Sequence, residues 1–230
     1  MRSFPFTPWF GAVLLAGAVA CLASAEQAES KSALETHPIG WIDLLKDKDL
    51  KDWKRVPIPV GSKLSERNPW KLEGQTLLCD GVKIHEMLLY DKEFSDGIFH
   101  VEWRFRKLEG DAKYNSGVYV RTSADGKVWH QAQVGNLNVG YLFGDTLVDG
   151  KLKRETIKSK VPQRGKPAGE WNVFEITCKG KDVTLWVNGA VTCEWNNCQV
   201  PKGHVGLEAE GYVIEFKNVK FRPLAPGEGK

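Results

Sequence analysis

Long apolar runs are almost absent from this 230-residue sequence, and no stretch keeps a helical period of apolar residues. The apolar stretch at residues 9–22 is shorter than the roughly 20 residues that a membrane-spanning helix needs. Neither sign of charge dominates, because 32 basic residues stand against 29 acidic ones. We therefore expect no membrane span and no nucleic-acid partner.

The N-terminal residues have the features of a secretory signal peptide. Arg2 supplies a positive charge, an apolar stretch follows, and residues 23–25 form an A-x-A cleavage site. The residues before Cys21 match a lipoprotein box poorly, so lipid anchoring is the less favoured alternative. We predict a signal peptide over 1–25, a flexible polar lead-in over 26–36, and an exported protein that is periplasmic or secreted.

Motifs for metals and cofactors are also missing. No C-x-x-C pair or histidine cluster indicates zinc, no glycine-rich loop has the spacing of a phosphate site, and Ser116 lacks the flanking residues of a nucleophile elbow. We predict no metal and no cofactor. Four cysteines follow the leader, and we expect a disulfide to close the short loop between Cys193 and Cys198.

Alternation of apolar and polar residues predicts strands along the rest of the chain. Between Gly97 and Lys107 apolar residues alternate with charged ones, which is typical of an antiparallel sheet with one open face. An Asn188-Gly189 turn joins two strands of a meander, and a phase change at 217–218 predicts a bulge. About a dozen short strands predict one all-β sandwich domain over 37–224, with a C-terminal tail at 225–230.

One long stretch, 148–170, is rich in lysine and arginine and shows no clear alternation. We interpret it as a loop without strands. Such a loop could be a lid or a patch for an anionic ligand, and a solvated surface excursion is the alternative.

The candidate functional hairpin lies at 113–134. Its two strands, Ser116–Arg121 and Trp129–Val134, should place their valines in the core. The opposite face then carries Tyr119, Arg121, Trp129, Gln131 and Gln133. These side chains could hydrogen-bond and stack against a polyhydroxylated ligand, while a solvated sheet face is the alternative.

Carboxylates on two other strands could join that face. If Leu207 is a core residue, then Glu208 and Glu210 point outwards, as Glu102 does on its own strand. Two carboxylates over a polar cleft suit glycoside cleavage, since one can donate a proton while the other activates water or attacks. Solvated surface glutamates are the alternative.

Seven motifs then occur in the order found in one protein family. They are NSGVYVR (115–121), the amide pair Gln131-x-Gln133, GYLFG (140–144), KPAGEWNVFEITCKG (166–180), VNG (187–189), GHVGLEAEG (203–211) and VIEFKNVKFRPL (213–224). Together they resemble the family once called domain of unknown function 1080 (DUF1080). That family is now named for 3-keto-disaccharide hydrolase, or 3-keto-glucoside 1,2-lyase and hydratase, activity. The resemblance covers about 39–224.

The resemblance implies a concanavalin-like jelly-roll sandwich of two antiparallel sheets, with a sugar site on the concave sheet. It also implies chemistry on glycosides that are already oxidised at carbon 3. A 3-keto group acidifies the neighbouring C2–H, so a base can remove that proton and expel the substituent at C1. The ligand would be a 3-keto mono-, di- or oligosaccharide.

Two family motifs read differently in this chain. Where the family usually has G-x-E-x-Q-I-x-D, Gln131 occupies the glutamate position and Asn136 lies near the aspartate position. Where the family often has G-L-Q-x-H-G, Glu208 and Glu210 replace the amide and the imidazole. Acidic groups have thus moved from one strand to another.

The leading hypothesis is an exported enzyme that cleaves 3-keto-glycosides. Glu208 is the candidate base or acid, and Glu102 is the candidate second carboxylate. The substrate-binding candidates are Asn115, Tyr119, Arg121, Trp129, Gln131, Gln133, Tyr141 and Glu210. The alternatives are a carbohydrate-binding module without catalysis and an interaction domain that binds through the basic stretch.

Overall fold

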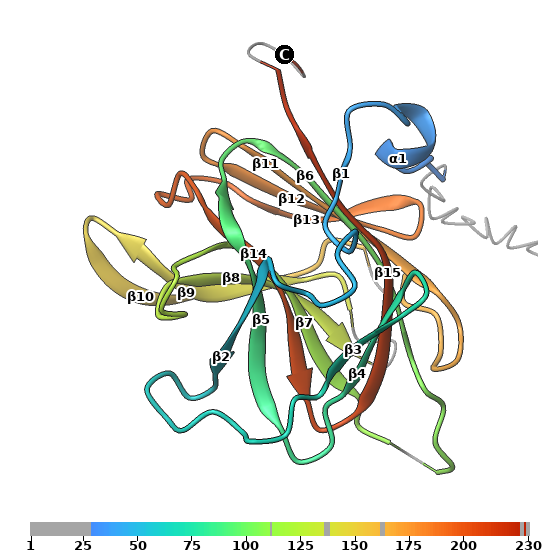
Figure 1. The fold of residues 1–230 in the computed structure, drawn as a ribbon. Helices are drawn as coiled ribbons and strands as arrows, with labels where there is room; N and C mark the ends of the chain where they lie inside the picture. Colours follow the sequence, from blue (N-terminus) through green and yellow to red (C-terminus); the bar gives the residue numbers. More distant parts are fainter. Residues whose placement is uncertain (1–28, 111, 136–138, 162–163, 226–227, 229–230) are drawn as a thin grey trace, which may run out of the picture.

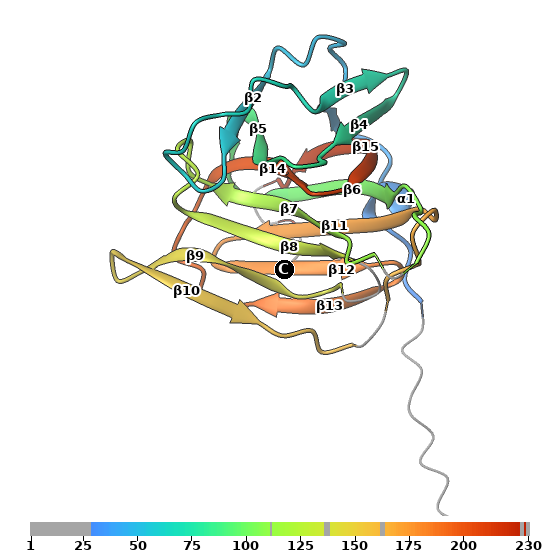
Figure 2. The same cartoon turned by 90° about the horizontal axis from the view of Figure 1, so that it is seen from below.

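The computed structural model describes residues 29–110, 112–135, 139–161, 164–225 and 228. Two antiparallel sheets pack face to face (Figures 1 and 2). One sheet contains β1 (Ile42–Asp43), β3 (Trp70–Glu73), β4 (Thr76–Asp80), β6 (Gly97–Phe105), β11 (Asn172–Lys179), β12 (Asp182–Val187), β13 (Ala190–Trp195) and β15 (Val213–Pro223). The other contains β2 (Trp53–Pro57), β5 (His85–Phe94), β7 (Asn115–Thr122), β8 (Trp129–Gly135), β9 (Leu142–Val148), β10 (Lys151–Ile157) and β14 (Gly203–Glu210).

The strand order explains how distant segments meet. The first sheet runs β13-β12-β11-β6-β15-β4-β3, with β1 added on β15, and the second runs β10-β9-β8-β7-β14-β5-β2. In the second sheet β14, near the C-terminus of the domain, lies between β7 and β5 (Figure 1). The predicted all-β sandwich of two antiparallel sheets is confirmed.

The core between the sheets follows the predicted alternation. On β6, Phe99, Val101 and Trp103 are buried, and on β14 so are Val205 and Leu207. Burying one such side chain stabilises the fold by roughly 1.5–3 kcal/mol. Because Val205 and Leu207 occupy the inner face of β14, the residues that alternate with them point away from the core.

Two predicted irregularities are present as expected. The pairing of β15 with β6 shifts register between Lys217 and Lys220, and Asn218 has a φ of +48°. This is the predicted bulge. Val187 pairs with Ala190 across the predicted Asn-Gly turn, in which both residues have positive φ.

The prediction of a strandless loop over 148–170 is wrong, because β10 lies within it. This strand forms a hairpin with β9, with Lys151 paired to Val148. The connecting residues Asp149 and Gly150 both have positive φ, as a tight hairpin turn requires. The basic side chains on β10 had hidden the strand pattern.

The described part of the lead-in, 29–36, is docked rather than free. It contains α1 (Ala33–Thr36), a single helical turn that begins with a capping box between Ser32 and Glu35. The Glu175 carboxylate on β11 accepts hydrogen bonds from the backbone N–H groups of Ala33 (2.6 Å) and Leu34 (3.1 Å). This contact covers part of the outer face of the eight-stranded sheet.

The expected signal peptide and Cys21 lie outside the described residues. Within the described part of the chain, no helix is long and apolar enough to cross a membrane.

The predicted Cys193–Cys198 disulfide is wrong. Cys79, Cys178, Cys193 and Cys198 are all buried with free thiols. The two candidate thiols point to different partners: the Cys193 thiol donates to the backbone carbonyl of Ile157 (3.2 Å), and the Cys198 sulfur lies 3.4 Å from His130 Nε2.

Candidate functional site

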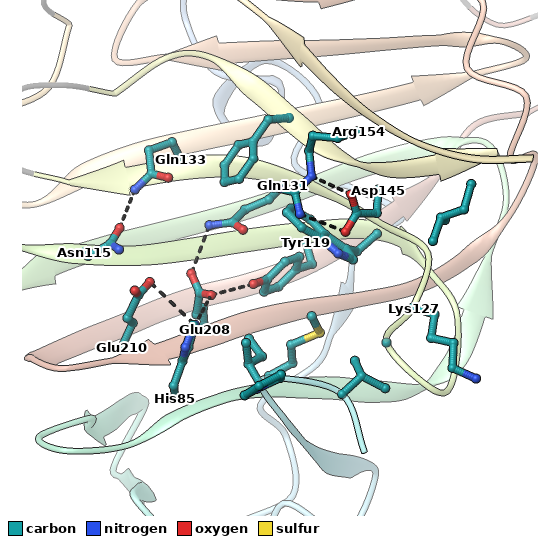
Figure 3. A pocket seen from close by; sticks show the side chains of 18 residues that line it. His85, Asn115, Tyr119, Lys127, Gln131, Gln133, Asp145, Arg154, Glu208 and Glu210 are labelled. Atoms are coloured by element: carbon teal, nitrogen blue, oxygen red, sulfur yellow. Dashed lines mark hydrogen bonds and ion pairs between the residues drawn. The ribbon is translucent and has the colours of Figure 1, made fainter. Parts of the chain in front are cut away.

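A cavity of about 550 Å³ opens on the seven-stranded sheet, on the face that points away from the core (Figure 3). Its size falls within the range of small-molecule sites, roughly 300–1,000 Å³. Seven of the ten predicted site residues line it: Asn115, Tyr119, Trp129, Gln131, Gln133, Glu208 and Glu210. Strand alternation on three neighbouring strands, β8, β7 and β14, brings these side chains to one place.

Glu208 lies at the centre of the polar part of the cavity, with only 3% of its surface exposed. Its Oε1 accepts a hydrogen bond from the Tyr119 hydroxyl (2.7 Å) and lies 3.1 Å from His85 Nε2. Its Oε2 accepts from the Gln131 amide (2.9 Å). These three contacts, shared between its two oxygens, hold the Glu208 carboxyl group in one orientation.

The surroundings of Tyr119 and Gln131 favour their hydrogen bonds to Glu208. Burial, followed by the nearby charge of Glu208, raises the pKa of Tyr119 well above its usual value, so the phenol stays protonated and can donate. Gly117 lies beside Gln131, and a Cβ there would overlap the Gln131 side chain. Glycine at this position therefore leaves room for the Gln131 side chain, whose amide can then reach Glu208.

His85 and Glu210 form a cluster of titratable side chains with Glu208. Glu210 Oε2 lies 3.8 Å from His85 Nε2. Burial, followed by repulsion from Glu208, raises the pKa of Glu210. The hydrogen bond to Glu208 raises the pKa of His85, although partial burial opposes it. One buried and two more accessible titratable groups thus meet where a ligand would bind.

The same three side chains are the residues most suited to a metal ion among those described. Each offers one ligand atom, and the three atoms lie within 4.8 Å of one another. Imidazole nitrogen and carboxylate oxygen are ordinary ligands of divalent cations. The cluster could therefore hold one cation or act as a set of proton donors and acceptors.

The raised pKa of His85 predicts a pH-dependent contribution to stability. Protonated His85 is favoured in the folded state, so its contribution is full below its ordinary pKa of 6.5 and disappears as pH rises through the higher folded value. We expect His85→Gln to lower Tm at pH 5 more than at pH 9, as measured by thermal melts at both pH values. His37→Gln, at an exposed position outside the cavity, controls for loss of a histidine. A Tm difference that grows towards pH 9 would contradict the assignment.

The other part of the cavity is aromatic and contains residues that the sequence did not reveal. The Trp129 ring makes edge contacts with Tyr119 and Phe143, with centroids 5.9 and 5.2 Å apart. The Arg154 guanidinium lies over Trp129 at 4.8 Å and donates two hydrogen bonds to Asp145, of 2.5 and 2.8 Å. Figure 3 shows this pair at the far end of the cavity from Glu210.

Glu102 lies on the opposite side of the molecule, so its predicted place beside Glu208 is wrong. Both glutamates do point away from the core, but β6 and β14 belong to different sheets. Glu102 instead contacts Lys217 (3.2 Å) and accepts a hydrogen bond from Asn218 (2.5 Å). Within the cavity, Glu210 is the carboxylate close to Glu208, while Asp145 is paired with Arg154.

Arg121 and Tyr141 also lie outside the lining of the cavity. Arg121 has a φ of +48°, which breaks the alternation of β7 and leaves its side chain only 1% exposed. Its guanidinium donates to the backbone carbonyl of Gly180 (2.8 Å) and lies 3.4 Å from Asp96. Tyr141 precedes β9 and packs its ring beside Phe143, with centroids 5.5 Å apart.

The contact between Gln131 and Glu208 gives the sequence exchange a physical meaning. Relative to the usual motifs, this chain has an amide where a glutamate is expected and a carboxylate where an amide is expected. The Gln131 side chain on β8 reaches over β7 and donates a hydrogen bond of 2.9 Å to Glu208 on β14. One carboxylate and one amide are therefore kept at nearly the same point. Asn136, the other altered position, lies outside the described residues.

Comparison with known families identifies the family of this chain. Residues 40–222 match the family of 3-keto-alpha-glucoside-1,2-lyase-like domains. The chain belongs to this family. No curated protein sequence gives a significant match.

Solved structures of carbohydrate-active proteins share the fold. A candidate glycosyl hydrolase from Parabacteroides distasonis superimposes with a TM-score of 0.59 at 18% identity, covering 86% of this chain and 100% of its own. The carbohydrate-binding module CBM66 from Bacillus subtilis gives 0.56 at 14% identity, covering 74% and 95%. The β-glucanase of Bacillus licheniformis gives 0.53 at 9% identity, covering 80% and 97%. At these identities the likeness establishes the fold alone.

Proposed function

We propose that this member of the 3-keto-alpha-glucoside-1,2-lyase-like family is an exported enzyme that cleaves 3-keto-glycosides. The observation that carries the proposal is Glu208, a carboxylate held by three side chains at the floor of a sugar-sized cavity. A fixed carboxylate can act as the base that the ketone-activated C2–H requires. The match to the family supports a 3-keto-glycoside as the substrate class.

The proposed reaction is an elimination. Glu208 takes the C2 proton, the electrons of that bond form the C1=C2 double bond, and the C1–O bond breaks with its electrons on the leaving oxygen. Glu210 gives that oxygen a proton, since its raised pKa favours the protonated form. Water can later add to the resulting enone. Glu210 thus takes the role that the sequence had suggested for Glu102.

Two amides at the polar end are the proposed sugar-binding groups. The Gln133 amide nitrogen donates to Asn115 Oδ1 (2.6 Å), which fixes both side chains in the cavity wall. Their remaining amide atoms can hydrogen-bond sugar hydroxyls. The sequence also placed Gln131 among the sugar-binding groups. In the structure its amide nitrogen donates to Glu208.

The purified mature chain should consume a 3-keto-glucoside or 3-keto-disaccharide and leave the unoxidised glycoside intact. Without the ketone the C2–H is not acidic enough for a carboxylate base. Chromatography of the released C1 alcohol measures the reaction, and the unoxidised sugar is the matched control. If the 3-keto sugar binds in calorimetry but is never converted, the chain is a carbohydrate-binding module.

The export part of the proposal rests on the N-terminal sequence. Arg2, the apolar stretch and the A-x-A site at 23–25 support a cleaved signal peptide. Cleavage after Ala25 would leave α1 and the whole sandwich intact, because α1 begins at Ala33 and every strand follows it.

A further inference from the structure

The cavity has two halves with different chemistry, and the second half bears on what is attached to C1. The first half contains the carboxylates, imidazole and amides around Glu208. The second, which we call the Trp129 half, is lined by Ile58, Val60, Trp129, Phe143 and Leu152. Figure 3 shows Lys127 and Arg154 at this end and Glu210 and Asn115 at the other.

The polar groups of the Trp129 half already have partners. Arg154 and Asp145 form an ion pair with two hydrogen bonds, and the guanidinium also lies over the Trp129 ring. The Lys127 ammonium lies 3.1 Å from the Asp125 carboxylate. Among the described residues of this half, the rest of the surface is hydrocarbon or aromatic. A second sugar placed here would have to share these ion-paired groups for its hydrogen bonds, whereas an aromatic ring needs none.

Two apolar side chains in the lining of this half are exposed. Leu152 on β10 is 56% exposed and Val60, in the connection after β2, is 37% exposed. Val60 lies against the turn at Gly126, next to Lys127, so it belongs to the same end of the cavity. Single exposed apolar residues are common, but two of them beside the aromatic pair Trp129 and Phe143 form a patch that a ligand would cover.

We propose, on the basis of the proposed function, that the Trp129 half binds an aromatic aglycone. The preferred substrate is then a 3-keto-glycoside of a phenol rather than of a second sugar. An aromatic ring would stack against Trp129 and Phe143 and cover Leu152 and Val60. When Glu208 removes the C2 proton, the C1–O electrons leave with the phenol oxygen, which takes its proton from Glu210. A phenol has a pKa of about 10, as in tyrosine, so it leaves more readily than a sugar alcohol.

The test compares kcat/KM for the phenyl and methyl 3-keto-glucosides of one anomer and for a 3-keto-disaccharide. Because phenol is intrinsically the better leaving group, the readout is the phenyl-to-methyl ratio in each variant relative to wild type. Leu152→Ala and Phe143→Ala should each lower that ratio about tenfold, the scale of losing one apolar contact. Leu108→Ala, at a 48% exposed position outside the cavity lining, should leave both kcat/KM values unchanged.

Each outcome bears on the inference separately from the proposed function. If the disaccharide is the best of the three substrates, or if both variants keep the wild-type ratio, the aglycone inference is wrong while cleavage of 3-keto-glycosides stands. If none of the three is converted, the proposed function fails. Calorimetry with the unoxidised phenyl and methyl glucosides then tests the aglycone inference. Equal affinity for the two glucosides would overturn it. Tighter binding of the phenyl glucoside to wild type than to Leu152→Ala would support it.

Discussion

Glu208→Gln should reduce turnover of a 3-keto-glucoside by roughly two to four orders of magnitude, the usual scale for losing a general acid or base. Glutamine has the same shape, and its amide oxygen can still accept from the Tyr119 hydroxyl. It cannot take the C2 proton, so the loss should fall on kcat rather than on KM. Steady-state kinetics measures the effect, and circular dichroism melts check that the variant is folded.

The neighbouring amide supplies a sharper control. Because Gln131 Nε2 and Glu208 Oε2 are 2.9 Å apart, the double variant Gln131→Glu/Glu208→Gln moves the carboxylate from β14 to β8, on the other side of β7, without leaving the cavity. We expect it to recover at least about tenfold of the activity lost in Glu208→Gln, if one carboxylate at this point is what the reaction needs. Gln131→Glu alone places two carboxylates in contact, which should raise the pKa of the pair.

Wild-type activity in Glu208→Gln would show that Glu208 is not the base, even though the family membership stands. If the double variant recovers no activity, the reaction needs the carboxylate at its position on β14. A fall in substrate affinity with unchanged kcat would instead assign Glu208 to binding.

Much of this site was predictable because alternation is a local property. On β7, β8 and β14 the core residues Val118, Ala132 and Leu207 alternate with residues on the other face, so the sequence itself indicates that Tyr119, Gln131 and Glu208 point away from the core. The Asn-Gly turn and the bulge near Lys217 are equally local. Such features need no knowledge of which strands are neighbours.

The errors have physical causes that alternation does not contain. Glu102 does point away from the core, but period two does not say to which sheet a strand belongs. Arg121 turns inwards because one positive φ reverses the phase of β7. The β10 strand has exposed basic residues in place of an apolar face, so alternation did not indicate it. Arg154, which lines the cavity from this strand, was therefore not predicted. His85 is separated from Glu208 by 123 positions, so their contact follows only from the pairing of β5 with β14.

A second large effect is expected where β2 and β5 hold the edge of the cavity. Glu86 is only 1% exposed, and its carboxylate accepts hydrogen bonds from Arg55 Nε (2.6 Å) and Nη2 (2.8 Å). Trp70 Nε1 donates to the same carboxylate (2.9 Å). Arg55 Nη2 also reaches the backbone carbonyls of Ser65 (3.0 Å) and Arg67 (2.9 Å). It therefore ties the connection after β2, which carries Ile58 and Val60, to the sheet.

Arg55→Ala should lower the free energy of unfolding by about 3–5 kcal/mol, because it leaves a buried carboxylate without its cation. Urea denaturation followed by tryptophan fluorescence measures the loss. Lys63→Ala, which breaks an ion pair whose side chains are 83% and 88% exposed, is the matched control and should change little.

The double variant Arg55→Met/Glu86→Leu separates the buried charge from the packing. Replacing both members of a buried ion pair by apolar residues is often neutral, so it should be clearly more stable than Arg55→Ala. If the double variant unfolds as easily as Arg55→Ala, the hydrogen bonds that it lacks, from Arg55 to Ser65 and Arg67 and from Trp70 to Glu86, account for the stabilisation. A loss below about 1 kcal/mol in Arg55→Ala would mean that Glu86 is satisfied without Arg55, as by protonation or by its bond from Trp70.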